Sequence, residues 1–193
     1  MNERSNAPNE AQPGTTAAGE LRYFSAASAR QPARVLVLAD THMPSRARAF
    51  PAPVLAALQE ANLIIHAGDF ASLEVLDELQ TFAPVVAVYG NVDPPEVRMR
   101  LPRRIIISVG RFRIGIVHGD GGPRTTIERA AQAFAFEDVD CIVFGHSHQP
   151  LCRREDDVLF LNPGSPTDKR HQSKYSFAWL HVGDTLDAEI VYF

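Results

Sequence analysis

Short motifs of aspartate, asparagine and histidine follow five apolar runs of this 193-residue chain. Each motif comes directly after a stretch typical of a buried strand, such as VLVLA before the first and CIVF before the last. The candidate ligand residues in these motifs are Asp40, His42, Asp69, Asn91, His118, His146 and His148. Because open α/β sheets place their sites at the carboxyl ends of strands, we expect these side chains to share one site.

The residue types in these motifs favour a metal centre. Oxygen and nitrogen ligands without cysteine suit Mn, Fe, Zn, Ni or Co. A carboxylate can bridge two ions, and Asp69 follows Gly68, which permits a tight approach. Two ions about 3.5 to 4 Å apart clamp a phosphoryl group for in-line displacement and make hydroxide available near neutral pH. The pattern therefore predicts hydrolysis of a phosphate ester.

The first half of the chain alternates between strand and helix patterns. Apolar runs predict strands at 35–39, 63–66 and 84–89, and amphipathic patterns predict helices at 53–62 and at 72–82, the latter capped by Ser72. Continuous apolar strands that alternate with helices are typical of a parallel sheet covered on both faces.

The second half is mainly strand. Gly110 and Arg111 predict a two-residue hairpin turn between strands at 105–109 and 112–117. Thr125 and Glu128 resemble a capping box that opens a helix through Phe136. Further strands are predicted at 139–144, near 151–154, 157–161 and 175–182, and at the C-terminus after a turn at 183–184. We therefore expect two packed sheets with helices outside, which is an α/β fold of the four-layer α/β/β/α sandwich type.

The composition fits one globular domain. Apolar residues make up 45% and charged residues 22% of the chain, and the net charge of -4 gives no global basic footprint for nucleic acid. Residues 1–33 are polar and small, so we interpret them as a flexible extension to a domain at 34–193. No apolar run has the length of a membrane helix and the N-terminus lacks an apolar signal core, so we expect a cytoplasmic protein.

The ordered motifs DTH, GD, GNVD, HGD and GHSH resemble those of the calcineurin-like metallophosphoesterase superfamily. The small size and the NPGS run at 162–165 resemble its small bacterial and archaeal phosphodiesterase branch, which also contains the small subunit of the retromer complex. The resemblance covers 34–193 and implies the same four-layer sandwich. It implies a phosphodiesterase with two divalent ions, with phosphomonoesters as a further substrate class. Manganese is the first expectation, and nickel, cobalt, zinc or iron are alternatives.

The resemblance also assigns roles to the candidate ligands. It implies that one ion is held by Asp40, His42, Asp69 and His148. It implies that the other is held by Asp69, Asn91, His118 and His146, so that Asp69 bridges the ions. Within this set, Asp69, Asn91 and His118 are expected to contribute most directly to catalysis.

The chain departs from many relatives at Val92, where they carry a histidine that protonates the leaving group or binds the phosphate. Because valine can do neither, we expect a preference for leaving groups that need little protonation. Asp93 then has no histidine to orient and is left without an assigned role. Asp120 follows the HG of the fourth motif and is a candidate for supporting the ligands from outside.

Other polar residues have weaker patterns. His66 is expected to be buried or to support a ligand, whereas His171 and His181 are interpreted as unrelated to the site. Arg124 and Arg170 are candidates, with Asn91, for binding the phosphate, because arginine offers a bidentate fork.

Two alternative functions share the expected fold. A protein-interaction scaffold would be expected to lose ligand residues, and all of them are present here. A nuclease would be expected to have capping segments and a basic surface, which the sequence does not indicate. We therefore expect a small phosphate-ester substrate, no membrane partner and no strong nucleic-acid binding. Edge strands would permit a homo-oligomer.

Overall fold

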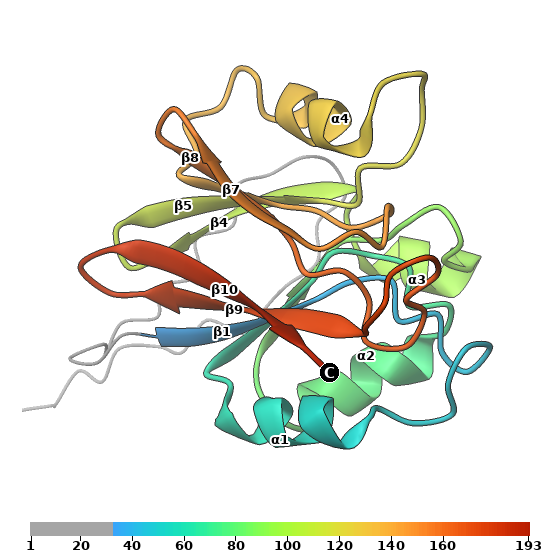
Figure 1. Ribbon diagram of the computed structural model, residues 1–193. Coiled ribbons are helices and arrows are strands. Elements are labelled where there is room, and N and C mark those ends of the chain that lie inside the picture. The colour runs from blue at the N-terminus through green and yellow to red at the C-terminus, as the bar shows by residue number, and fades with distance from the viewer. Residues whose placement is uncertain (1–32) are drawn as a thin grey trace, which may run out of the picture.

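Two five-stranded sheets lie face to face in the computed structural model, which describes residues 33–193 (Figure 1). The extension predicted at 1–33 lies outside the described residues except for Ala33. The first sheet has the order β10-β9-β1-β2-β3. Its strands are β1 (Ala33–Leu38), β2 (Leu63–His66), β3 (Val85–Ala87), β9 (Ser176–Val182) and β10 (Leu186–Tyr192). As predicted, β1, β2 and β3 are parallel, while β9 pairs antiparallel with β1.

The second sheet has the order β4-β5-β6-β8-β7. Its strands are β4 (Arg104–Val109), β5 (Phe112–Val117), β6 (Cys141–Val143), β7 (Leu151–Glu155) and β8 (Val158–Asn162). The predicted hairpin joins β4 to β5, and its Gly110 has a φ of 59°, which is the left-handed region that such turns require. The parallel strands β5, β6 and β8 form the middle of this sheet.

Helices cover the outer faces of both sheets (Figure 1). They are α1 (Ala52–Glu60), α2 (Leu73–Gln80), α3 (Pro95–Arg100) and α4 (Thr126–Ala133). The capping box of α4 is present as predicted, but the helix ends at Ala133 instead of Phe136. Ser72 occupies the N-cap position of α2, yet its side chain makes no capping hydrogen bond. The short helix α3 was not predicted from the sequence, although Pro95 stands at its first position, where the fixed φ of proline suits a helix start.

Three apolar clusters lie between the layers and hold the sheets and helices together. The cluster between the sheets contains β-branched side chains from both, such as Val37 and Ile65 from the first and Ile116 from the second. A second cluster packs α1, α2 and Val97 of α3 against the first sheet, and a third packs α4 against the second sheet. The predicted four-layer sandwich is therefore confirmed.

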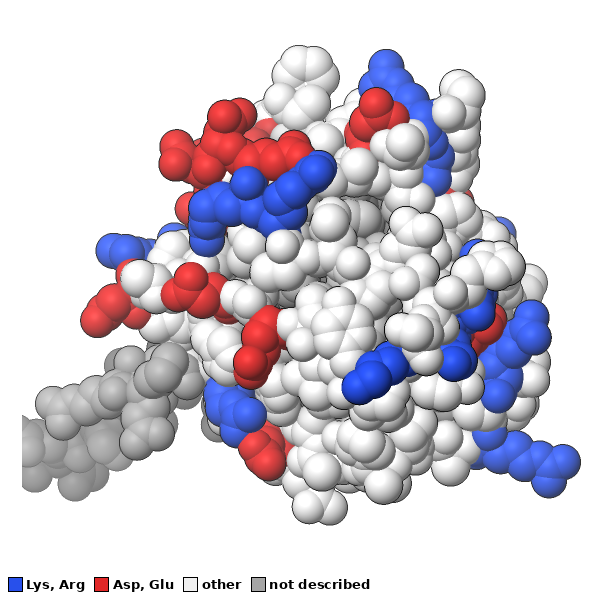
Figure 2. Space-filling view, in the orientation of Figure 1, with Lys and Arg blue, Asp and Glu red and all other residues white. Residues whose placement is uncertain are grey.

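The surface carries both signs of charge. In Figure 2 basic side chains lie in separate groups, several of them beside acidic ones. Ion pairs of this kind join Arg100 to Asp77 at 3.0 Å and Arg104 to Glu137 at 3.5 Å. Within residues 33–193, none of the helices has the length and apolar character needed to cross a lipid bilayer.

Candidate metal centre

The loops after four strands bring six of the predicted ligand residues into two groups. Asp40, His42 and His148 form one group, and Asp69, His118 and His146 form the other. Within each group the candidate ligand atoms lie within 4.8 Å of one another. The aspartates and His42 follow strands of the first sheet, whereas His118, His146 and His148 follow strands of the second. The site therefore lies where loops from both sheets meet.

Most of these residues adopt a backbone conformation that is unusual for anything but glycine. Positive φ angles occur at Asp40 (55°), His42 (46°), Asp69 (61°), His146 (66°) and His148 (56°). Such conformations cost on the order of 1–3 kcal/mol each and cluster at functional sites. Backbone hydrogen bonds stabilise them here: the amides of Asp40 and His42 donate to the carbonyls of Gly68 and Asp69, both at 3.0 Å. The loops after β1 and β2 are thus fixed to each other.

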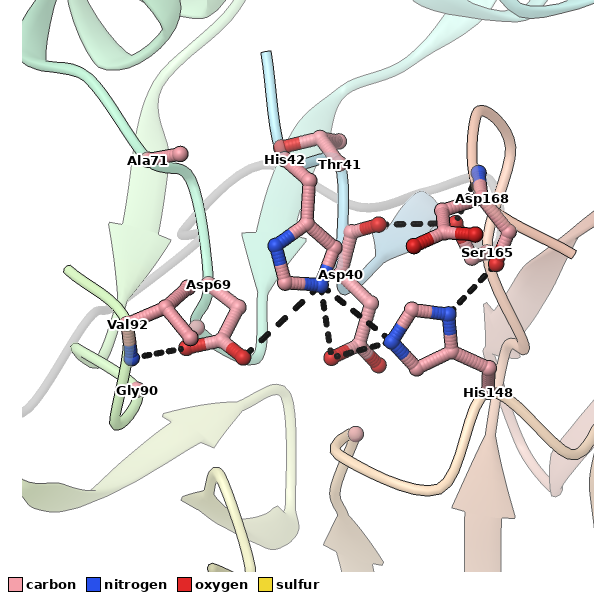
Figure 3. A network of polar contacts seen from close by, with 12 residues as sticks. Asp40, Thr41, His42, Asp69, Ala71, Gly90, Val92, His148, Ser165 and Asp168 are labelled. Carbon is pink, nitrogen blue, oxygen red and sulfur yellow. Dashed lines mark hydrogen bonds and ion pairs between the residues drawn. The ribbon is translucent and has the colours of Figure 1, made fainter. Parts of the chain in front are cut away.

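Asp69 lies between the two groups. Its Oδ2 is 3.1 Å from Nε2 of His118 and 3.8 Å from Nε2 of His42, and the second contact is drawn in Figure 3. Its other oxygen, Oδ1, accepts a hydrogen bond of 3.0 Å from the backbone amide of Val92. One oxygen is therefore held by the chain, and the other faces ring nitrogens of both groups.

Backbone carbonyls orient two of the histidine rings. Nδ1 of His118 donates to the carbonyl of Ala67 at 2.7 Å, and Nδ1 of His148 donates to the carbonyl of Asp168. In the neutral rings this leaves the Nε2 lone pairs directed into the site, as in metal-binding histidines. Nε2 of His148 lies 3.2 Å from Nε2 of His42 and 3.5 Å from Oδ1 of Asp40.

These atoms fit a cation because they are buried polar atoms without hydrogen-bond partners. Both carboxylate oxygens of Asp40 and Nε2 of His118 are buried and have no hydrogen-bond partner. Burial raises the pKa of Asp40 to about 7. Burial lowers the pKa of His118, but the contact with Asp69 and the charge of Asp40 outweigh it and raise the pKa to about 9. A buried charge or lone pair left unpaired is costly, so this arrangement requires protons or divalent cations.

Asn91 lies at the edge of the cluster. It is exposed, and its backbone carbonyl accepts a hydrogen bond of 2.6 Å from Nη2 of Arg98. Its neighbours Gly90 and Val92 both contact Asp69: a Cβ added at Gly90 would lie 2.1 Å from Oδ1 of Asp69. The predicted role of the Asn91 side chain as a ligand stays a prediction.

His66 is fully buried beneath the site, as expected. Its Nδ1 accepts from the amide of Gly68 at 3.2 Å, so its Nε2 carries the proton and donates to Oγ1 of Thr41, also at 3.2 Å. Its ring stacks on Phe70 with centroids 3.6 Å apart. Burial lowers its pKa to about 3, so the ring is neutral. His66 therefore joins the loops after β1 and β2.

The segment 162–168, which begins with the NPGS run, supports the same loops from the other side. Oγ of Ser165 donates to the carbonyl of Asp40 at 2.7 Å, and Oγ1 of Thr167 donates to that of Thr41. Nδ2 of Asn162 donates to the carbonyl of Gly145 at 2.8 Å. Figure 3 shows Ser165 and Asp168 beside Asp40 and His148.

The two arginines predicted to bind phosphate, Arg124 and Arg170, differ in their contacts. Nη1 of Arg124 donates to Gln132 on α4 at 2.8 Å. Arg170 is exposed, and its positive charge acts on the site: the pKa of His148 is lowered to about 4, mainly by burial and in part by the charge of Arg170. Asp120 pairs with Arg103 at 3.1 Å, and His181 pairs with Glu189 on the surface at 3.3 Å.

Asp93 is the functional candidate that sequence reasoning missed. It is only 2% exposed, and its carboxylate accepts hydrogen bonds from the backbone amides of Asp69, Ala71 and Gly90. Aspartate is a known turn former, and its place three residues after Gly90, which follows a predicted strand, is the sequence feature that points to the role.

Comparison with known proteins agrees with this geometry. The calcineurin-like phosphoesterase superfamily domain matches residues 34–185. The chain belongs to this superfamily. A probable metallophosphoesterase of Methanothermobacter thermautotrophicus is 38% identical over 155 residues, which cover 80% of this chain and 90% of the relative. Membership of the family indicates a metal-dependent phosphoesterase.

Several solved structures are similar to this chain in fold. Vps29 of Entamoeba histolytica, solved as a zinc complex, has a TM-score of 0.66 at 28% identity, over 82% of this chain and 98% of that chain. A structure described as a novel archaeal phosphodiesterase has a TM-score of 0.66 at 21% identity, over 83% and 99% of the two chains. At that identity, the second neighbour supports the fold alone.

Proposed function

We propose that this superfamily member is a dinuclear-metal phosphodiesterase formed by residues 34–193. The observation that carries the proposal is the set of buried polar atoms without hydrogen-bond partners, namely both carboxylate oxygens of Asp40 and Nε2 of His118. They lie among the remaining candidate ligands of two adjacent groups. The zinc complex of the Vps29 neighbour supports ion binding by this fold.

In this proposal each group holds one ion. Asp40, His42 and His148 would hold the first, and His118, His146 and Asn91 would hold the second, with Asp69 shared. When bound, two divalent ions supply an activated water and neutralise charge on the phosphoryl group. Manganese is our first candidate, and nickel, cobalt, zinc and iron suit the same ligands.

The side chains of the protein contribute fixed ring orientations and a positive charge to the proposed reaction. The carbonyls of Ala67 and Asp168 fix the His118 and His148 rings, so no reorganisation is needed when the substrate arrives. We assign the exposed Arg170 to a phosphate oxygen in preference to Arg124, which already bonds Gln132. A single such arginine favours a diester, which carries less charge than a monoester.

The test compares bis(4-nitrophenyl) phosphate with 4-nitrophenyl phosphate as substrates, each with Mn, Ni, Co, Zn or Mg and after chelation. We expect metal-dependent hydrolysis of the diester and its loss by at least 100-fold in Asp69→Asn, since the shared carboxylate is removed. Asp77→Asn, which alters a surface ion pair, is the matched control. Full activity of Asp69→Asn would show that Asp69 does not bridge ions.

The alternative is a protein-interaction scaffold of the same fold, to which the Vps29 neighbours point. Metal analysis of the purified protein distinguishes the two functions. An enzyme is expected to bind divalent ions after reconstitution and to hydrolyse the diester. A protein that binds no transition metal, even on reconstitution, would favour the scaffold.

A further inference from the structure

Asp93 makes a set of contacts that its surface-loop sequence, GNVDPP, does not indicate. Its Oδ2 accepts from the amide of Asp69 at 2.9 Å and from the amide of Gly90 at 2.8 Å, and its Oδ1 accepts from the amide of Ala71 at 2.9 Å. The side chain is buried, so these bonds form away from competing water. One carboxylate therefore holds the chain at three points.

The three points belong to two different strand ends. Asp69 and Ala71 follow β2, whereas Gly90 follows β3 and precedes Asn91. Both Asp69 and Ala71 have positive φ angles, of 61° and 72°, which such residues adopt only when surrounding contacts hold them there. Hydrogen bonds to an ionised acceptor are among the stronger ones in proteins, and here they supply those contacts.

The same contacts bring the chain against the shared carboxylate. With the Gly90 amide fixed, Val92 reaches Oδ1 of Asp69 with its own amide at 3.0 Å, and Gly90 lies so close that any side chain there would collide with that oxygen. Figure 3 shows Gly90 and Val92 beside the Asp69 carboxylate. Oδ2 of Asp69 is thereby directed to His118.

We propose that Asp93 is a positioning residue that sets the Asp69 carboxylate between the two ions and aligns Asn91 with it. The inference rests on the proposed dinuclear function. In this role Asp93 acts through Asp69 and Gly90, because its carboxylate accepts from backbone amides. An ionised carboxylate is needed because all three neighbours are donors: an asparagine would turn an NH₂ group toward at least one of them.

The test is Asp93→Asn, which preserves volume and removes part of the acceptor capacity. Its matched control is Asp140→Asn, because Asp140 also accepts a backbone amide, that of Arg113 at 2.7 Å, at the opposite ends of the strands. Manganese affinity is measured by calorimetry, and magnetic coupling between two manganese ions by electron paramagnetic resonance. We expect Asp93→Asn to weaken the binding of manganese by about 10- to 100-fold and to lose the coupling. Asp140→Asn is expected to retain both.

The outcomes separate this inference from the proposed function. If the wild-type protein binds none of Mn, Ni, Co, Zn and Fe, the proposed function fails; if it binds one of the others in place of manganese, the same comparison is made with that metal. If the wild-type protein binds two coupled ions and Asp93→Asn matches Asp140→Asn, only the positioning role is wrong. A loss of thermal stability with unchanged manganese affinity would also overturn the positioning role, since it would show a purely structural one.

A measurement on the wild-type protein keeps the inference testable should Asp93→Asn not fold. Hydrogen exchange of the Asp69, Ala71 and Gly90 amides is followed with and without manganese. We expect all three to be protected and to slow by a similar factor when manganese binds, because one carboxylate holds them. Rapid exchange of these amides in the folded protein would contradict the proposal.

Discussion

Burial selects the protonation state of individual side chains at this site. His66 is the clearest case, because it is buried among Thr41, Gly68 and Phe70 and stays neutral. Burial lowers its pKa from 6.5 to about 3. In the unfolded chain the same ring takes up a proton below its ordinary pKa, so acid favours unfolding.

This difference predicts a pH dependence of stability in the metal-free protein. The contribution of His66 is fully present above pH 6.5 and is lost as the pH falls from 6.5 toward 3. The loss approaches about 1.4 kcal/mol per pH unit, or about 2 kcal/mol between pH 6.5 and 5. Urea unfolding with a chelator present should show that the free energy of unfolding of His66→Gln falls less between pH 6.5 and 5 than that of the wild-type protein, by about 2 kcal/mol. His181→Gln, on the surface, is the control, and equal losses in wild type and His66→Gln would refute the assignment.

Val92 carries a second prediction at this scale. Its side chain is 47% exposed next to Asn91, where it can donate no proton. We expect rates of diester hydrolysis to fall steeply as the leaving-group pKa rises, because a positioned acid typically contributes about 10²–10⁴-fold. A flat dependence for the wild-type protein would count against this view.

A variant tests the same residue directly. Val92→His should speed hydrolysis of alkyl diesters more than aryl diesters, by about tenfold or more, if it supplies the missing donor. Met99→His, at another exposed apolar position on α3, should change neither rate. Equal effects of the two substitutions would show that position 92 is not special.

Among the structural elements, segment 162–168 supports the loops after β1 and β6. Oγ of Ser165 donates to the carbonyl of Asp40 and accepts from the amides of Thr167 and Asp168, at 2.7, 3.3 and 2.8 Å. Asp168 in turn holds the His148 ring through its carbonyl and forms an ion pair with Arg46 at 3.3 Å. Ser165 and Asp168 together therefore link the loop after β1 to the loop after β6.

Loss of that hydroxyl should weaken both the fold and the metal centre. Ser165→Ala leaves buried backbone groups without partners, which costs about 1–3 kcal/mol of unfolding free energy. We also expect manganese affinity to fall by about tenfold, because the supports of Asp40 and His148 loosen. Urea unfolding and metal titration measure the two effects, with the exposed Ser173→Ala as control. An effect on stability alone would limit the segment to a structural role.

For the whole molecule, the important feature is that the two groups of ligands combine loops from both sheets. Asp40 and His42 leave β1 of the first sheet, and His148 follows β6 of the second. A bound ion would therefore connect the sheets as well as the loops, and it binds the folded chain only. Such binding stabilises the fold by about 2.7 kcal/mol at a concentration 100 times the dissociation constant.

Calorimetric unfolding should show this coupling. We expect manganese to raise the Tm by about 5–10 °C over the chelated protein, given that about 1 kcal/mol corresponds to 2–4 °C in a domain of this size. Asp69→Asn should show a much smaller rise. A wild-type Tm that does not respond to metal would argue against ions held between the sheets.

Much of this architecture could be predicted from local sequence patterns. The runs before Asp40 and Asp69, the Gly110 turn and the Thr125–Glu128 capping box correctly placed β1, β2, the hairpin and α4. Apolar periodicity and turn chemistry are encoded within a few residues, so they can be read without the fold. The order of the motifs likewise indicated the family.

Tertiary structure decided what depends on contacts between distant residues. His42 and His148 are 106 residues apart, and only the packing of two sheets brings their nitrogens to 3.2 Å. The buried role of Asp93 likewise depends on the amides of the neighbouring strand end, which its own exposed-looking motif does not specify. The sequence by itself determined which side chains could bind metal and at which strand ends they lie. The tertiary structure decided their grouping, ring orientation and supports, because these arise from long-range packing and hydrogen bonds.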